Sequence, residues 1–205
     1  MCRLVLLVIG TFSLFLSCGK QDEDYIVKTS PDGKYRVEVS VRALKATGTR
    51  EYDEQVTLQF FKGGQSLYKS ESRNSDQFEP SFGATTPSIE WIGDNIIRMG
   101  GSPAGQPFHD ELIIVNDSDE RLTYCDVSYG AFETFFVFDL PARSQTTLQG
   151  SPRFNAEGYF NWFLGYGGKS ESGKEFHGSL RGRKRESPSE GPLRFEIKIT
   201  GKDFR

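Results

Sequence analysis

Residues 29–44 read TSPDGKYRVEVSVRAL, a turn followed by the clearest strand pattern in the chain. Pro31 presets φ for the turn, and Gly33 can take the positive φ that such a turn requires. From Tyr35 to Val41, apolar residues alternate with charged and polar ones, which is the period of a strand with one buried face. The stretch therefore predicts a half-buried β-strand.

The same pattern continues along the chain. QVTLQFF at residues 55–61 alternates in the same way, and PSIEWIGDNIIRM at residues 87–99 predicts two strands about a turn at residues 93–95. Seven further strand candidates follow residue 108: ELIIVN, RLTYCDVSYG, AFETFFVFDL, SQTTL, EGYFNWFLGY, KEFHGSLRG and LRFEIKIT. Aromatic residues make up 13% of the chain and there are 22 glycines, a composition typical of strands and turns.

We predict an all-β protein, an antiparallel β-sandwich with an N-terminal β-meander at residues 25–100 and an immunoglobulin-like half at residues 108–205. The boundary, GGSPAGQP at residues 100–107, rests on composition alone, so the halves form either two domains or one continuous sandwich. The second half, from VNDSDERLTYCDVSYG to PARSQTTL, is similar to small Ig-like domains of exported bacterial proteins. SPDGKYRV and IEWIGDN resemble the first and last strands of a β-propeller repeat, but one copy cannot close a propeller.

The N-terminal region predicts export. Residues 4–16, LVLLVIGTFSLFL, follow Arg3 and carry no charge. A membrane-spanning helix needs about 20 apolar residues, so this stretch is too short for a span and suits the apolar region of a cleaved signal peptide. The alternatives are a signal anchor that stays in place or a buried N-terminal strand.

Residues 15–18, Phe-Leu-Ser-Cys, resemble the lipobox of bacterial lipoproteins, with bulkier side chains than usual at the first two positions. The resemblance implies that residues 1–17 are a lipoprotein signal peptide, and that Cys18 receives a diacylglycerol and, after cleavage, an N-terminal acyl chain such as palmitate. Two or more chains anchor a protein stably, so the implied partner is a membrane. Residues 18–24 are then an acidic tether, and Gly19, where aspartate would signal retention, favours the outer membrane over the inner.

The chain has three cysteines. If Cys2 leaves with the leader and Cys18 is lipidated, Cys125 remains alone and no internal disulfide forms. In RLTYCDVSYG, strand alternation puts Cys125 on one face with Thr123 and Val127, so we interpret it as a small buried hydrophobe. The alternatives are a bridge between an unlipidated Cys18 and Cys125, and a nucleophilic Cys125.

The stretches of the sequence that resemble phosphate-binding or calcium-binding motifs predict turns instead. GYGGKSESGK has Phe163 where a phosphate-binding loop needs glycine, so it predicts a hairpin turn. NDSDE at residues 116–120 lacks the spacing of an EF-hand and predicts an Asx-type turn rather than a calcium site. We expect no metal, no cofactor and no catalytic residue. A hydrolase using His109 or His177 beside carboxylates is an alternative, because a catalytic triad can form from distant residues.

Aromatic and basic stretches offer candidate binding residues. Trp162 and Tyr166 share a predicted strand face in GYFNWFLGY, which we interpret as core packing. The alternative is an exposed row of such rings, which would suit sugars. RGRKRESPSEGP predicts a solvated hairpin loop, and contact with lipid head groups or an anionic polymer is the alternative. The formal net charge of −3 gives no case for nucleic acid. The candidate ligand-binding residues are therefore Trp162, Tyr166, Trp91, Arg181, Arg183, Lys184 and Arg185.

These observations lead to three hypotheses about function. In the first, the protein is a membrane-anchored bacterial lipoprotein that acts at the cell envelope as a non-catalytic binding or structural module, with a polymer or a protein as partner. The alternative is a carbohydrate or cell-wall-polymer binding module that uses exposed aromatics. The hydrolase is a further alternative. Fold alone does not choose among them.

Overall fold

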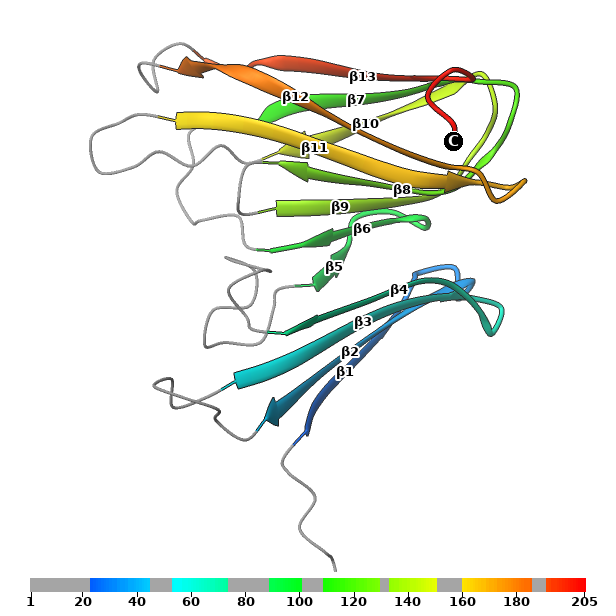
Figure 1. Cartoon of the computed structure of the whole chain (residues 1–205), viewed down its shortest axis with the longest axis vertical. Helices are drawn as coiled ribbons and strands as arrows, with labels where there is room; N and C mark the ends of the chain where they lie inside the picture. Colours follow the sequence, from blue (N-terminus) through cyan, green and yellow to red (C-terminus); the bar gives the residue numbers. More distant parts are fainter. Residues whose placement is uncertain are drawn as a thin grey trace, which may run out of the picture.

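The computed structural model describes residues 23–44, 53–73, 89–100, 109–129, 133–150, 160–185 and 191–205. These residues form thirteen β-strands arranged in three sheets (Figure 1). The proposed leader, Cys18 and residues 101–107 of the composition boundary lie outside the described residues. Within the described part of the chain, no helix has the length and apolarity needed to cross a bilayer.

Sheet A is a four-stranded antiparallel meander, as predicted for the N-terminal region. It is shorter than the predicted range of residues 25–100, because β4 ends at Arg73 and the next two strands belong to another sheet. Its strands are β1 (Glu23–Thr29), β2 (Tyr35–Leu44), β3 (Asp53–Lys62) and β4 (Gln65–Arg73). Gly33 takes the expected positive φ of 74° in the turn between β1 and β2, where its N–H donates to the Ser30 carbonyl at 2.9 Å. Glu23 and Asp24, which we assigned to the tether, belong to β1.

Sheet B has six strands in the order β12-β11-β8-β9-β6-β5. Their bounds are β5 (Ile89–Trp91), β6 (Ile96–Met99), β8 (Leu122–Tyr129), β9 (Glu133–Leu140), β11 (Phe160–Ser170) and β12 (Glu175–Arg185). The first two form the predicted hairpin, and β6 then pairs with β9. Strands that precede residue 100 therefore extend the sheet made by the second half of the chain.

Sheet C contains β10 (Ser144–Gly150), β7 (Asp110–Asp117) and β13 (Arg194–Thr200), in that order. β10 pairs with β7 antiparallel, whereas β13 pairs with β7 in parallel. All seven strand candidates after residue 108 are thus confirmed as strands. The all-β, sandwich-like arrangement is confirmed as well, and the immunoglobulin-like organisation of the second half stays a prediction.

Sheet B is the middle layer, because its two faces contribute to two different cores. In β9, Phe135 and Val137 belong to the core shared with sheet C, whereas Phe136 and Phe138 belong to the core shared with sheet A. All four side chains are buried. A strand covered on both faces has a continuous apolar sequence rather than an alternating one, as TFFVF in β9 does.

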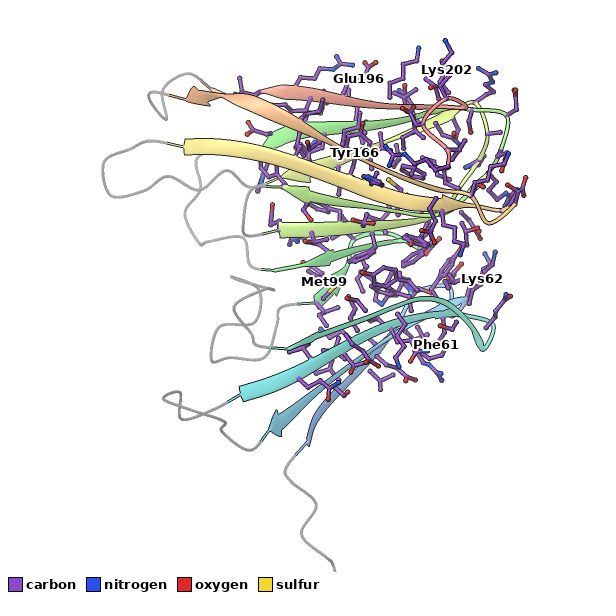
Figure 2. The ribbon with its side chains drawn as sticks, viewed as in Figure 1. Phe61, Lys62, Met99, Tyr166, Glu196 and Lys202 are labelled. Carbon is purple, nitrogen blue, oxygen red and sulfur yellow. The ribbon has the colours of Figure 1, made fainter. Side chains whose placement is uncertain are left out.

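The three layers are offset from one another. The core between sheets A and B includes side chains of β5, β6, β8 and β9, and Met99 is labelled within it in Figure 2. The core between sheets B and C includes Leu164 of β11 and Phe176 of β12, with Tyr166 packed against it. On the sheet A side of β12, His177 and Ser179 are exposed. Sheet A therefore leaves the β11 and β12 part of that face open.

The segment after β13 crosses from sheet C to sheet B. Its turn is held by Asp203, whose carboxylate accepts hydrogen bonds from the backbone and hydroxyl of Thr200 at 2.7 and 2.8 Å. Arg205 then exchanges backbone hydrogen bonds with Glu175, at the start of β12. Between them, the Phe204 ring packs edge-on against Phe176 at 5.7 Å. This segment covers one side of the core between the two sheets.

Candidate functional site

The strand register brings the predicted basic run next to the predicted aromatic segment. The backbone of Arg185 pairs with Phe160, and that of Arg181 pairs with Phe163. Trp162 falls where the register between β11 and β12 shifts. For this part of the two strands the structure describes the backbone and not the side chains. The register is therefore what relates the aromatic residue Trp162 to the four basic candidates, Arg181, Arg183, Lys184 and Arg185.

Trp91 and Tyr166, the other two aromatic candidates, are not brought together. Trp91 lies on the sheet A face of β5, with ring centroids 6.3 Å from Tyr35 and 6.1 Å from Phe138. Its indole Nε1 is buried and has no hydrogen-bond partner among the described residues. Tyr166 lies on the opposite face of sheet B, over Gly178, where a Cβ would come within 2.3 Å of its ring. Both rings take part in core packing.

The histidines and Cys125 occupy separate positions. His109 is exposed immediately before β7, in sheet C, and His177 is exposed on β12, in sheet B, with its Nε2 3.5 Å from a guanidinium nitrogen of Arg205. Cys125 is fully buried, as expected, and burial raises the pKa of its thiol well above the usual range. Because the thiolate is the reactive form of cysteine, this position disfavours a nucleophilic role.

Asn116 forms the predicted Asx-type turn and also links that turn to the end of β9. Its Oδ1 accepts hydrogen bonds from the backbone N–H and hydroxyl of Ser118, at 3.2 and 2.7 Å. Its Nδ2 donates to the carbonyl oxygens of Glu120 at 2.9 Å, Pro141 at 2.8 Å and Leu140 at 3.3 Å. The buried amide therefore ties the turn between β7 and β8 to the end of β9. Among the described residues, no group of three or more His, Cys, Asp or Glu could hold a metal ion.

A polar cluster that the sequence did not reveal joins sheets A and B. The Tyr35 hydroxyl and the Lys62 ammonium, both from sheet A, donate to the carboxylate of Asp139 at the end of β9. Asp139 adopts a positive φ of 52°, which aspartate tolerates better than most residues. Burial acts to raise the pKa of Asp139, but the hydrogen bonds from Lys62 and Tyr35 outweigh it and lower that pKa. We call these three residues the inter-sheet clasp.

The clasp predicts an acid-dependent contribution to stability. A carboxylate whose pKa is lower in the folded state stabilises the fold above its unfolded pKa of about 3.9, and this contribution is lost as the pH falls through the folded pKa. Asp139→Asn is therefore expected to lower the free energy of unfolding by about 1–2 kcal/mol at pH 7, with a smaller loss below pH 3, measured by urea unfolding. Glu71→Gln, which breaks the exposed Lys69–Glu71 pair, is the control and should change little. An equal effect of Asp139→Asn at both pH values would contradict the clasp.

A second cluster lies where the edge of sheet A meets sheet B. Tyr68 of β4 and Tyr124 of β8 pack edge to face, with ring centroids 5.3 Å apart and an interplanar angle of 68°. Asp126 lies two residues after Tyr124 and so on the same face of β8. The carboxylate lies beside Gly167 of β11, where a Cβ would be 3.3 Å from Oδ1. We call Tyr68, Tyr124 and Asp126 the seam cluster.

All three residues of the seam cluster have raised pKa values. Burial raises the pKa of Asp126, opposed only in part by a backbone hydrogen bond of the same residue. Burial and then the negative charge of Asp126 raise the pKa of Tyr124 to about 12. Burial and the same charge also raise the pKa of Tyr68, against a hydrogen bond with Ser70 that lowers it. A half-buried carboxylate with a perturbed pKa is a common feature of functional sites.

The sequence contained a signal for the seam cluster. In RLTYCDVSYG, the alternation that places Cys125 and Val127 in one core puts Tyr124, Asp126 and Ser128 on the opposite face. An aspartate between core positions of a central strand is unusual, because removing a carboxylate from water is costly unless the charge is paired. The contribution of Tyr68 was not visible, because it depends on how sheet A packs on sheet B.

Comparison with known proteins adds no assignment to this geometry. No protein-family model, no curated protein and no solved structure matches the chain. A fold supports many functions, so the function has to be argued from the side chains and their chemistry.

Proposed function

We propose that the protein is a lipid-anchored module of the bacterial cell envelope that acts by binding or by structural support. Two overlapping sequence features support this proposal: the uncharged stretch at residues 4–16 and the lipobox-like residues 15–18 at its end. Acylation at Cys18 would anchor the chain without a spanning helix. If the cell has two membranes, Gly19 favours the outer one.

The position of β1 is consistent with such an anchor. β1 begins at Glu23, five residues after Cys18. Five extended residues reach at most about 18 Å, so a lipidated Cys18 would hold sheet A close to the lipid surface. β1 is an edge strand of that sheet. The membrane-proximal part of the module would then be the edge of the N-terminal meander.

The proposal predicts that Cys18→Ala releases the protein from the membrane. Expressed in a Gram-negative host, the unchanged chain should be found in the membrane fraction, with a diacylated Cys18 at the N-terminus of its first peptide by mass spectrometry. Cys18→Ala should lose the lipid mass, because the thiol that accepts it is gone. Cys125→Ala is the matched control, because that thiol is buried in the core, and it should keep both the lipid mass and the membrane location.

Other masses at the N-terminus would overturn the anchor. A free N-terminus a few residues from Cys18 would mean a soluble exported protein, and an intact Met1 would mean that no leader is removed. Either result would mean that the folded domain is not held at a membrane through Cys18.

Binding of a sugar or cell-wall polymer is the second candidate function. The observation that favours it is the register of β11 and β12, which places the run containing Arg181 and Arg185 beside the segment containing Trp162. A row of aromatic rings next to cations suits an anionic polysaccharide. Co-sedimentation of the protein released by Cys18→Ala with purified cell-wall polymer tests this candidate, and a protein that stays in the supernatant rejects it.

A further inference from the structure

The seam cluster offers three groups that attract a cation and come from two sheets. Tyr68 belongs to β4, the last strand of sheet A, and Tyr124 and Asp126 belong to β8 of sheet B. The two rings meet edge to face at 5.3 Å, and Tyr68 also packs on Phe60 and Phe136 in the core between sheets A and B. Both tyrosines are half-buried, so part of each side chain stays accessible from outside. Aromatic faces attract cations through the negative potential above the ring.

The carboxylate of Asp126 lacks a cationic partner in the part of the chain that the structure describes. The nearby Lys169 of β11 instead pairs with Glu175 of β12, with 3.5 Å between Nζ and Oε1. Asp126 itself is half-buried. A carboxylate that is partly removed from water gains more from a cation than an exposed one does, because the local dielectric constant is lower.

The neighbouring strand leaves this carboxylate approachable. Asp126 pairs across the sheet with Gly167, and Gly167 pairs with His177. Gly165 and Gly167 are half-buried and carry no side chain on the sheet A side, and His177 and Ser179 beyond them are exposed. The open part of the sheet B face thus begins beside Asp126. A ligand could approach along β11 without displacing a side chain of that strand at Gly165 or Gly167.

We infer that Tyr68, Tyr124 and Asp126 bind an alkylammonium group. The carboxylate supplies the opposite charge, and the two rings supply a surface on which the alkyl substituents of the cation can lie. A hard metal ion would require several oxygen ligands, which the two rings cannot provide. A neutral sugar would leave the carboxylate charge uncompensated.

The source we assign to this group is a small soluble molecule rather than a lipid head group. β4 is the edge of sheet A opposite to β1, three strand spacings or about 14 Å away. If β1 lies near the lipid surface, the seam cluster lies on the far edge of the sheet. The inference itself goes beyond the proposed anchor, because binding at these residues does not depend on lipidation of Cys18.

The test uses choline and its neutral isostere 3,3-dimethylbutan-1-ol, which replaces the nitrogen with carbon and keeps the shape. NMR spectra of the purified full-length protein would follow the ring resonances of Tyr68 and Tyr124 and the carboxyl resonance of Asp126. Choline is expected to shift all three saturably, at millimolar concentration, as a single small site of this kind allows. The isostere is expected to bind at least about tenfold more weakly, because it lacks the charge.

Three variants separate binding from folding. Asp126→Asn keeps the shape of the side chain, removes its charge and is expected to weaken choline binding at least about tenfold. Tyr124→Leu keeps an apolar side chain, removes the ring and is expected to weaken choline binding at least about tenfold, because the cation loses one aromatic face. Glu196→Gln removes an exposed carboxylate from β13 in sheet C and should change nothing.

Several outcomes would overturn the inference. These are no shift with choline, equal binding of the isostere, unchanged binding after Asp126→Asn in a variant that still unfolds cooperatively, and a response to calcium alone. Tighter binding to phosphatidylcholine vesicles than to free choline would overturn the assignment to a soluble ligand. The N-terminal mass measurement is independent of all of these, so a failure here leaves the proposed anchor untouched.

Discussion

Gly168→Ala is expected to lower the free energy of unfolding by about 3 kcal/mol, the upper part of the range for forcing an extra methyl group into a packed site. A Cβ at Gly168 would lie 2.4 Å from the carbonyl oxygen of Tyr124 and 2.5 Å from the Phe176 ring. The first contact is with the backbone of β8, so β11 and β8 would have to separate where they are hydrogen-bonded. For a domain of this size the melting temperature should fall by roughly 6–12 °C, measured by circular dichroism.

Gly201→Ala is the matched control for this substitution. Gly201 lies in the turn after β13, and a Cβ there would meet nothing within 4 Å. The melting temperature of the Gly201→Ala protein should stay within about 1–2 °C of that of the unchanged protein, since surface substitutions away from special features have small effects. A Gly168→Ala protein as stable as the Gly201→Ala protein would show that β11 and β8 are not paired in this register.

Asn116→Ala is expected to cost about 3 kcal/mol as well, for a different reason. The side chain is fully buried, and its removal takes the Oδ1 acceptor from the Ser118 N–H and the Nδ2 donor from three carbonyl oxygens. The Glu120 and Pro141 carbonyls each keep one hydroxyl donor. A buried polar group that loses its partner costs about 1–3 kcal/mol, and several share one partner here. Urea unfolding followed by tryptophan fluorescence would measure the loss.

The comparison for Asn116 is Ser144→Ala. The Ser144 hydroxyl donates to the same Pro141 carbonyl at 2.7 Å, but this hydrogen bond is exposed to solvent. Its removal should cost less than about 0.5 kcal/mol, because water replaces the lost donor. Equal effects of the two substitutions would mean that the Asn116 amide does not join the β7–β8 turn to the end of β9.

Alternation in the sequence was sufficient to predict the strands and much of the core. Val37, Val39, Val56 and Leu58 are buried as their period of two predicts, and the turn glycines Gly33, Gly63 and Gly64 take positive φ. The arrangement of the sheets was not predictable in this way. TFFVF in β9 shows that a strand is covered on both faces, but it does not show which sheets cover it. Nor does any local pattern indicate that β6 pairs with β9.

The candidate sites show the same division between local and long-range information. The Asx-type turn at Asn116 was predictable, because it depends on neighbouring residues. The inter-sheet clasp brings together Tyr35, Lys62 and Asp139, which are up to 104 positions apart, so no spacing in the sequence could indicate it. The seam cluster lies between these cases. Tyr124 and Asp126 share a strand, whereas Tyr68 reaches them only through the packing of two sheets.

The parallel pairing of β7 with β13 has a consequence for the order in which the chain folds. Neighbouring strands of sheet A are joined by short connections, and such local contacts form quickly. Leu112 of β7 instead pairs with Phe195, more than 80 residues later, and closing so long a loop is slow. During synthesis the strands emerge in sequence, so Leu112 and Ile114 remain without their β13 neighbours until residues 194–200 have been made. The core between sheets B and C is therefore completed last, and the interval before that step is when the chain is most open to aggregation.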